Sequence, residues 1–486
     1  MSEVWITFAC EDFVNPQTDE ADRRLAELVV GNDLVAEFFF SGAKALATHR
    51  HRPDVVEYLN DTGMVIGYQG NGHSIHPVIV EYSADKDWEE GVAEARCRET
   101  QYLRLDGTLD PVRDGGIELV AEVFGRRPVS CRAPGHGWSP QFLWALREWG
   151  VSVFHTVYDL GEYTGFSTNF YLGAFHAPPG SRNRLSLEQW MDDGDAGRFA
   201  QDFEALAADY PYRGEKLIFV SFHPCLLVSD VFWDALNYAG GRNPLPPDAL
   251  VPSPPLSPDV AERRWQTLED IFAFLGSRSD LEVILPRTLA DRYALTPVVL
   301  GRDELLRLAV VLVSQERLLL PDYVLVEDRV YSAAEAFDLL CQTLTEYRRT
   351  GGLPEQLTTS MARGPADGLL EPPAAGRQDI SLERVIDVAT GLSAGCVPEA
   401  VEGGILPSQF LFLMAEAVMA LAERRRLGTV PVPPTANVSS IARRFHADWP
   451  LQMRKWPIHD PRLDLDLLTR LATLQFWSYK PAGFPW

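Results

Sequence analysis

The chain has 486 residues, and its 68 acidic side chains against 44 basic ones give a formal net charge of −24. This acidic balance disfavours binding to nucleic acid and to anionic membrane surfaces. The apolar content of 46% is ordinary for a globular protein with a sizeable core. No apolar run approaches the roughly 20 residues of a membrane span, and the length predicts two or three domains.

The cysteine pattern and the N-terminus bear on the compartment. The six cysteines are dispersed in apolar contexts without a Cys-x-x-Cys pair: Cys10, Cys97, Cys131, Cys225, Cys341 and Cys396. This fits reduced, buried thiols in a cytosolic protein better than a disulfide framework. The first residues also lack the basic region and long apolar stretch of a secretory signal. We therefore expect a cytoplasmic protein.

The first half of the chain alternates short apolar strands with amphipathic helices. We predict strands over 4–10, 35–40, 64–66, 128–131, 151–156, 217–222 and 282–285. We predict helices over 19–30, 53–60, 87–102, 116–124, 140–149 and 260–276. Polar residues recur directly after the strands, where parallel α/β folds place their chemistry. The alternation therefore predicts a parallel barrel or a doubly wound sheet.

The remainder of the chain has a different character. A Pro-rich stretch over 243–255 cannot form a helix or a central strand, so we expect a loop that covers the strand ends. We place a domain boundary near Thr296-Pro297, which gives domains 1–296 and 297–486. The second domain is predicted to be helical, because the order helix, aliphatic-Pro, long helix, aliphatic-Pro occurs twice. The Trp-rich tail either seals the first domain or forms a groove for a ligand or partner.

The most unusual stretch is Ile-Gly-Tyr-Gln-Gly-Asn-Gly-His-Ser-Ile-His-Pro over 66–77. Gln69, His73 and His76 stand here among three glycines, directly after an apolar run. Imidazole is the commonest side-chain metal ligand, and glycine lets a loop approach an ion closely. His73 and His76 alone fit surface histidines or hydrogen-bonded core histidines as well as metal ligands. A metal site therefore has to be argued from the other motifs.

Three further segments place polar residues after a predicted strand. They are Thr7-Phe8 followed by Glu11-Asp12, Arg132-Ala133-Pro134-Gly135-His136-Gly137-Trp138, and Ser221-Phe222-His223. Together with the histidine loop, they make the first 295 or so residues resemble the polysaccharide deacetylase (NodB-homology) superfamily, carbohydrate esterase family 4. The resemblance implies a distorted parallel (β/α) barrel, followed here by an all-α C-terminal domain. It also implies one divalent metal, with zinc first among the candidates, at the carboxyl ends of the strands.

The resemblance also implies roles for the acids and the histidine loop. Asp12 matches the metal-binding acid and Glu11 the general base, although the pair stands two residues later than in the family motif Thr-Phe-Asp-Asp. In one register of the histidine motif, Gln69 and His73 take the ligand positions; in the other, His73 and His76 pair. We prefer the first, because the preceding Ile-Gly and the four-residue spacing both match the family motif. A neutral amide is a poor zinc ligand, so His76 could substitute for Gln69.

The remaining motifs complete the implied site. In the family, the residue matching Arg132 orients the base, the backbone amide at Gly135 holds the oxyanion, and Trp138 would wall the acyl pocket. His223 would protonate the departing amine, with Asp159 as a candidate to orient it. Packing and core hydrogen bonding are equally open roles for Trp138 and His223.

The resemblance implies a metal-dependent hydrolase that removes an acetyl group from an N-acylated sugar or a related small amide. Two alternatives stay open. One is a catalytically degenerate barrel kept as a binding or assembly module, and the other is a metal-independent hydrolase of cyclic ureides or imides. The helical repeats also resemble pseudomurein-binding repeats, which leaves a protein partner or a homo-oligomer through the second domain as an expectation.

Overall fold

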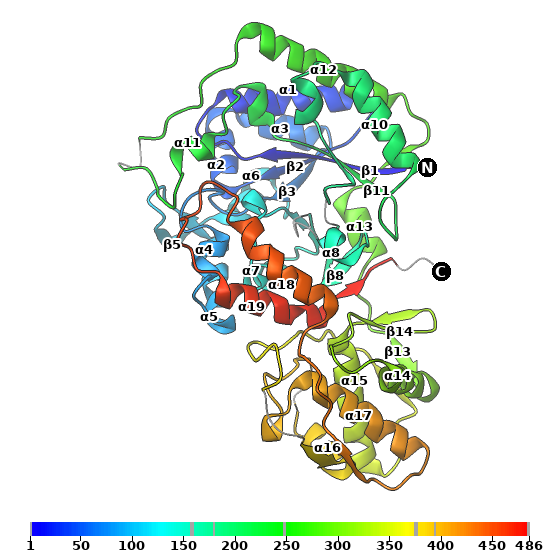
Figure 1. Cartoon of the computed structure of the whole chain (residues 1–486). Coiled ribbons are helices and arrows are strands. Elements are labelled where there is room, and N and C mark those ends of the chain that lie inside the picture. Colours follow the sequence, from blue (N-terminus) through cyan, green and yellow to red (C-terminus); the bar gives the residue numbers. More distant parts are fainter. Residues whose placement is uncertain are drawn as a thin grey trace. The chain divides into compact units, whose positions relative to one another are not determined.

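The computed structural model describes residues 2–155, 160–177, 180–245, 249–373, 378–392 and 395–483 (Figure 1). It divides into two compact units. Unit 1 comprises Met1–Thr168, Phe175–Tyr293 and Gln452–Leu465, and unit 2 comprises Asn169–Ala174, Ala294–Leu451 and Asp466–Trp486. The main division after Tyr293 lies close to the predicted boundary at Thr296. The prediction did not include the assignment of Asn169–Ala174 to unit 2 or of Gln452–Leu465 to unit 1.

Unit 1 is built on a parallel sheet. Its strand order is β10 (Arg184–Ser186), β11 (Leu217–Phe222), β1 (Ser2–Cys10), β2 (Glu37–Phe40), β3 (Val65–Tyr68), β6 (Ser130–Cys131), β7 (Val153–Phe154) and β9 (Ala174–His176). The start of β1 also pairs with β12 (Leu281–Val283). The pairings of neighbouring strands in this row are parallel, which confirms the predicted parallel α/β class. The described pairings form a row and not a closed ring, so the predicted barrel is not confirmed.

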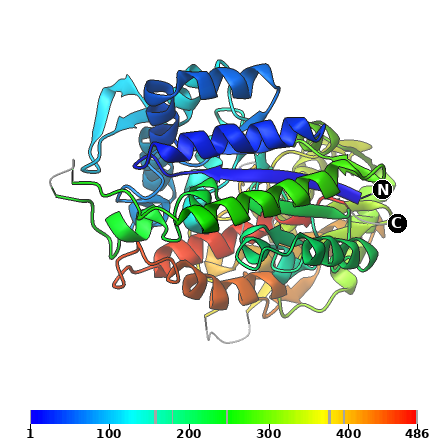
Figure 2. The same ribbon diagram turned by 90° about the horizontal axis from the view of Figure 1, so that it is seen from above.

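Helices cover the strands of unit 1. They are α1 (Gln17–Gly31), α2 (Gly42–His51), α3 (Pro53–Asp61), α4 (Ile79–Ser83), α5 (Trp88–Thr100), α6 (Gly116–Phe124), α7 (Pro140–Arg147), α8 (Leu160–Thr164), α9 (Glu188–Met191), α10 (Ala196–Ala208), α11 (Trp233–Asn237), α12 (Pro258–Gly276) and α13 (Pro286–Arg292). Figure 2 shows α1 and α12 running alongside β1. Phe272 of α12 packs against Phe8, with ring centroids 6.2 Å apart. Most side chains on the other face of β1 are buried as well. A hairpin that was not predicted, β4 (Gln101–Leu103) with β5 (Leu109–Asp114), follows α5.

Unit 2 mixes helices with short antiparallel strand pairs. The helices are α14 (Arg302–Ser314), α15 (Ala333–Thr350), α16 (Leu382–Ala389), α17 (Pro407–Ala422), most of α18 (Ser440–Met453) and α19 (Asp466–Leu474). The paired strands are β13 (Val299–Gly301) with β16 (Gln356–Thr358), β14 (Val324–Val326) with β15 (Arg329–Tyr331), β17 (Asp379–Ser381) with β18 (Thr429–Pro431), and β8 (Asn169–Tyr171) with β19 (Lys480–Pro481). The prediction of an all-α domain is therefore wrong. Strands of two or three residues are too short to show a period of two in the sequence.

The helices of unit 2 follow the same order twice. Strand β13, helices α14 and α15, and strand β16 come first, and β17, α16, α17 and β18 repeat the arrangement. The backbone contacts also correspond, because Arg302 donates to the carbonyl of Glu355 and Leu382 donates to that of Gly428. Both long helices contribute buried apolar side chains to one core.

Two chemical expectations can be compared with the fold. Cys97 on α5 is exposed and Cys396 is half-buried, so the expectation of buried thiols is wrong at these two positions. Among the described residues, no helix has both the length and the apolarity that a membrane crossing needs.

Candidate functional site

Several strands of unit 1 end at the same level and deliver polar side chains to one edge of the sheet. The last residues paired across β1, β2, β3, β6 and β7 are Cys10, Phe40, Tyr68, Cys131 and Phe154. The next residues on β1, β3, β6 and β7 are Glu11, Gln69, Arg132 and His155. Because side chains alternate between the faces of a sheet, these four belong to one face.

Beneath this edge, the same face of the sheet carries buried aromatic side chains. The ring of His155 packs against Trp5 and Phe219, with centroids 5.0 and 5.1 Å away. Trp5 Nε1 donates to Glu37 Oε2 over 2.9 Å, and Ser130 Oγ donates to the other oxygen of that carboxyl. Burial raises the pKa of Glu37 to about 8, although the two hydrogen bonds act in the opposite direction. Glu37 is therefore neutral at pH 7 and supports the site from below.

Glu11 and His73 form a buried pair at the strand ends. His73 Nε2 lies 2.9 Å from Glu11 Oε2, and Gln69 Nε2 donates to the same oxygen over 3.3 Å. Burial favours the neutral acid, but interactions with the imidazoles of His73 and His223 and with the guanidinium of Arg132 outweigh it and lower the pKa of Glu11 to about 2. Glu11 is consequently ionised at neutral pH.

Asp12 faces a different environment from its neighbour. Its Oδ1 accepts hydrogen bonds from the backbone N–H of Val14 over 2.8 Å and of Asn15 over 3.0 Å. Burial raises the pKa of Asp12 to about 6. The acid that contacts His73 is therefore Glu11, whereas the resemblance implied Asp12.

His76 is also occupied elsewhere. Its Nδ1 lies 2.6 Å from Glu81 Oε2, and its Nε2 lies 2.9 Å from the backbone oxygen of Tyr238. Both ring nitrogens are thus engaged away from Glu11. Of the two registers considered for the histidine loop, the one with Gln69 and His73 brings its side chains to the same acid.

The predicted metal ligands do not fit a metal together. Asp12 and His76 are committed to other partners, which leaves Glu11, His73 and the neutral amide of Gln69 around one point. Within the part of the chain that the structure describes, no three His, Cys, Asp or Glu side chains are grouped so that they could hold an ion.

A second acid–imidazole pair contacts Arg132. His223 Nδ1 is 2.7 Å from Glu188 Oε1, and the backbone N–H of His223 donates to the same oxygen over 3.1 Å. Arg132 Nη2 lies 3.3 Å from His223 Nε2. Because a guanidinium only donates, this contact makes Nε2 the acceptor and leaves the proton on Nδ1, toward Glu188.

The electrostatics of this second pair follow from its burial and charges. Burial opposes ionisation of Glu188, but its hydrogen bonds with His223 and Ser186 lower the pKa of the carboxyl overall. Burial and the neighbouring Arg184 lower the pKa of Arg132 to about 10, which still leaves the guanidinium charged at pH 7. Arg132 Nη1 is buried without a hydrogen-bond partner among the described residues.

Sequence reasoning did not find Glu188. It follows β10, whose Ser186 pairs in parallel with Ser221 of β11, so its position after a strand matches that of the predicted site residues. The strand has only three residues, which is too short for a periodic signal. Asp159, the residue predicted to orient His223, lies outside the described residues.

Glu11, His73 and His223 line one pocket of about 380 Å³, and Glu188 contacts it through His223. It is lined by Glu11, Gln69, His73, Arg132, Gly135, His136, His223, Phe232, Asp234, Ala235, Gln452, Met453, Lys455, Trp456 and Pro457. All these residues belong to unit 1. Trp138, the predicted wall of the acyl pocket, is fully buried and does not line it. The tryptophan that does line it is Trp456, from the tail whose role the sequence left open.

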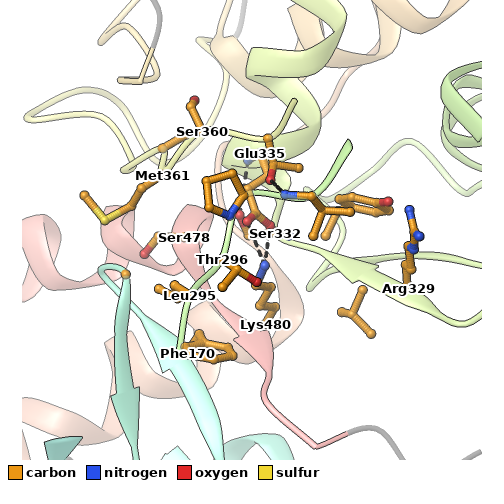
Figure 3. A pocket seen from close by; sticks show the side chains of 17 residues that line it. Phe170, Leu295, Thr296, Arg329, Ser332, Glu335, Ser360, Met361, Ser478 and Lys480 are labelled. Carbon is orange, nitrogen blue, oxygen red and sulfur yellow. Dashed lines mark hydrogen bonds and ion pairs between the residues drawn. The ribbon is translucent and has the colours of Figure 1, made fainter. Parts of the chain in front are cut away.

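Unit 2 carries a pocket of its own, of about 290 Å³, shown in Figure 3. Glu335 forms an ion pair with Lys480 over 2.7 Å and accepts from the backbone N–H of Ser332 over 2.8 Å. Arg329 pairs with Glu304 over 2.9 Å. These charges are balanced within the protein, and none of the sequence motifs reaches this pocket. The candidate site is therefore the pocket in unit 1.

Comparisons with known proteins give weak similarities only. No family model matches the chain, and no curated protein matches it. Among solved structures, a proposed polysaccharide deacetylase from Mycobacterium smegmatis is 14% identical over 60% of this chain and 88% of its own, with a TM-score of 0.34. A CE4-family pseudoenzyme from Bacillus anthracis is 11% identical over 46% of this chain and 55% of its own, with a TM-score of 0.27.

The similarity extends to a third kind of protein. A 4-alpha-glucanotransferase from Thermococcus litoralis is 12% identical over 72% of this chain and 46% of its own, with a TM-score of 0.38. At these values the similarities assign neither a family nor an activity to this chain. None of them supports the resemblance of unit 2 to pseudomurein-binding repeats.

Proposed function

We propose that unit 1 is a hydrolase that cleaves the C–N bond of an N-acylated sugar or a related small amide. The observation that carries the proposal is the convergence of acid–base and charged groups in one pocket. His223 with its Glu188 partner, the guanidinium of Arg132 and the ionised Glu11 line or border the same 380 Å³. A cavity with few convergent polar groups and perturbed pKa values is the usual setting of an active site.

The residues present can account for both proton transfers in amide hydrolysis. A water oxygen bonds to the carbonyl carbon, the C–N bond breaks, and the amine leaves with a proton. His223 lines the pocket, Glu188 holds its Nδ1, and its Nε2 becomes free for water when Arg132 moves from it to the carbonyl oxygen of the substrate. It can therefore take the proton from water and return it to the nitrogen. Arg132 can hold the carbonyl oxygen as negative charge develops there.

Glu11 has a different role in this proposal from the one that the family resemblance implied. A carboxylate with a pKa of about 2 is a weak base, because His73 and the neighbouring cations stabilise its charge. We assign Glu11 to balancing the charge of Arg132 and orienting His73. The acid–base function passes to His223.

A second candidate function is binding without turnover. It is favoured by Gln69, which donates to Glu11 where the family would place a metal-binding histidine. With Asp12 and His76 engaged elsewhere, unit 1 could serve as a recognition module whose pocket holds an intact ligand.

Amine and carboxylate release from a panel of N-acetylated sugars, simple amides and cyclic imides tests the proposal. We expect turnover of at least one member, and a loss of about 100-fold or more in kcat on His223→Ala, the size typical for an acid–base catalyst. His49→Ala, at an exposed position in the last turn of α2, is the matched control and should retain the wild-type rate. Equal rates for both variants would remove His223 from the mechanism.

The same assay with and without added metal distinguishes metal-dependent hydrolysis from hydrolysis by the side chains alone. Protein treated with a chelator is compared with the same protein after zinc addition. Retained turnover without metal is the result that our proposal expects. Turnover that zinc alone restores would favour the metal-dependent form, and intact binding with no turnover under either condition would favour the recognition module.

A further inference from the structure

Trp456 is held in the pocket of unit 1 from several sides. Its Nε1 donates to Asp234 Oδ2 over 3.1 Å. Its ring meets those of His73 and His459 edge to face, with centroids 5.8 and 5.2 Å away and planes at 88° and 89°. An indole fixed in this way loses little freedom when it contacts a ligand.

Gly135 makes room for this tryptophan. A Cβ at position 135 would overlap the Cδ2, Cε2 and Cε3 atoms of Trp456, and Gly135 also has a φ of +53°, which disfavours other residues. The six-membered ring of Trp456 therefore fills the space into which a side chain at 135 would project. Two positions more than 300 residues apart in the sequence share one volume of the pocket wall.

The segment that carries Trp456 is anchored directly after this residue. His459 Nδ1 lies 3.1 Å from Glu81 Oε1, next to the Glu81–His76 pair. The backbone N–H groups of Gly240 and Gly241 donate to the carbonyls of Pro457 and Ile458, and Ile458 is fully buried. Trp456 is consequently a fixed wall of the pocket.

We propose that Trp456 is the specificity-determining wall of a subsite that selects substrates with a ring over acyclic amides. The inference rests on the proposed function for the identity of the bond that is cleaved. The half-exposed indole offers an apolar face, while Lys455 and Gln452, hydrogen-bonded to each other over 2.6 Å, line the same cavity. An apolar face beside polar groups suits a pyranose ring, which has an apolar face and a hydroxyl-bearing edge.

Binding of one ligand that has a ring and of one that has none tests the role of Trp456. Affinities for N-acetylglucosamine, which has a ring, and for acetamide, which has none, are measured by ligand-observed NMR titration. We expect Trp456→Ala to weaken N-acetylglucosamine binding about tenfold and to leave acetamide within about twofold. Trp456→Phe should keep most of the affinity for N-acetylglucosamine, because it leaves an aromatic face at the same position and no side chain at the positive-φ position 135.

Controls and turnover make each outcome informative. Leu451→Ala, an exposed apolar residue close before the segment, should bind both probes like the wild type. The inference is overturned if Trp456→Ala binds N-acetylglucosamine as the wild type does. It is also overturned if Trp456→Ala and Trp456→Phe each lower both affinities equally. A wild type that binds neither probe overturns it as well. Selective binding without turnover supports the inference and counts against the proposed hydrolysis. Turnover of N-acetylglucosamine that Trp456→Ala leaves unchanged supports the hydrolysis and counts against the inference.

Discussion

Single residues in this site owe their properties to their environment more than to their type. Glu11 and Glu37 are both buried glutamates of unit 1, yet cations lower the pKa of Glu11 to about 2 and burial raises that of Glu37 to about 8. The sequence could predict that Glu11 follows a strand. The motif match alone did not show which acid of the Glu11-Asp12 pair would face His73. The alternation Trp5, Thr7, Ala9, Glu11 along β1 carries that information, since odd positions share a face.

Glu37→Gln should change how stability depends on pH. Between the ordinary pKa of 4.5 and the folded value of about 8, the folded chain holds a proton that the unfolded chain releases. Glu37 therefore lowers the free energy of unfolding by up to about 1.4 kcal/mol per pH unit as pH rises through this window. Gln at this position can still accept from Trp5 and carries no such proton.

Thermal unfolding at pH 5.5 and pH 8 checks this prediction. The Tm of Glu37→Gln, relative to that of the wild type, should be higher at pH 8 than at pH 5.5. A Tm difference that stays constant between the two pH values would show that Glu37 is ionised in the folded protein.

At the scale of elements, the site depends on parallel strands that end at one level. The alternation of strands and helices and the polar residues after β1, β3, β6 and β11 were predictable, because long apolar runs and glycine-rich ends leave clear patterns. Glu188 was not, since β10 has three residues. The contribution of Trp456 was not predictable either, because nothing local relates a tryptophan in the tail to Gly135.

The loop after β3 allows a test of the metal question by substitution. Gln69→His would place a second imidazole beside Glu11 and His73, which already lie 2.9 Å apart. Imidazole is a far better zinc ligand than an amide, so we expect zinc affinity to rise at least tenfold. Competition with a chromophoric chelator measures the affinity.

Gln266→His, at an exposed position on α12, is the control and should bind zinc like the wild type. Tight stoichiometric zinc in the wild type, unchanged by Gln69→His, would mean that the ligands rearrange around an ion and that the metal-dependent prediction deserves preference.

At the scale of the whole molecule, the two units do not correspond to two uninterrupted stretches of chain. Gln452–Leu465 belongs to unit 1 although it follows most of unit 2 in the sequence. Its Met453, Ile458 and Leu465 are buried. A boundary chosen from composition places this segment in the second domain, because a segment of 14 residues has too little composition of its own to reveal its location.

A fragment of residues 1–296 should therefore be less stable than unit 1 in the full chain. It lacks the buried side chains of the segment, each worth about 1.5–3 kcal/mol when fully buried. We expect a lower Tm and dye binding to exposed apolar surface. Joining residues 452–465 to the fragment through a flexible Gly/Ser linker should restore part of the loss. A fragment as stable as the full chain would show that the segment adds nothing to the fold of unit 1.

The central claim is that His223, held by Glu188, moves protons in the pocket of unit 1. The most direct measurement is the kcat of chelator-treated Glu188→Gln, relative to the wild type, on the best substrate of the panel. We predict a kcat reduced by 10- to 100-fold with KM little changed, because an amide keeps the hydrogen bond but cannot stabilise the imidazolium. An unaltered kcat, or a change confined to KM, would contradict the claim.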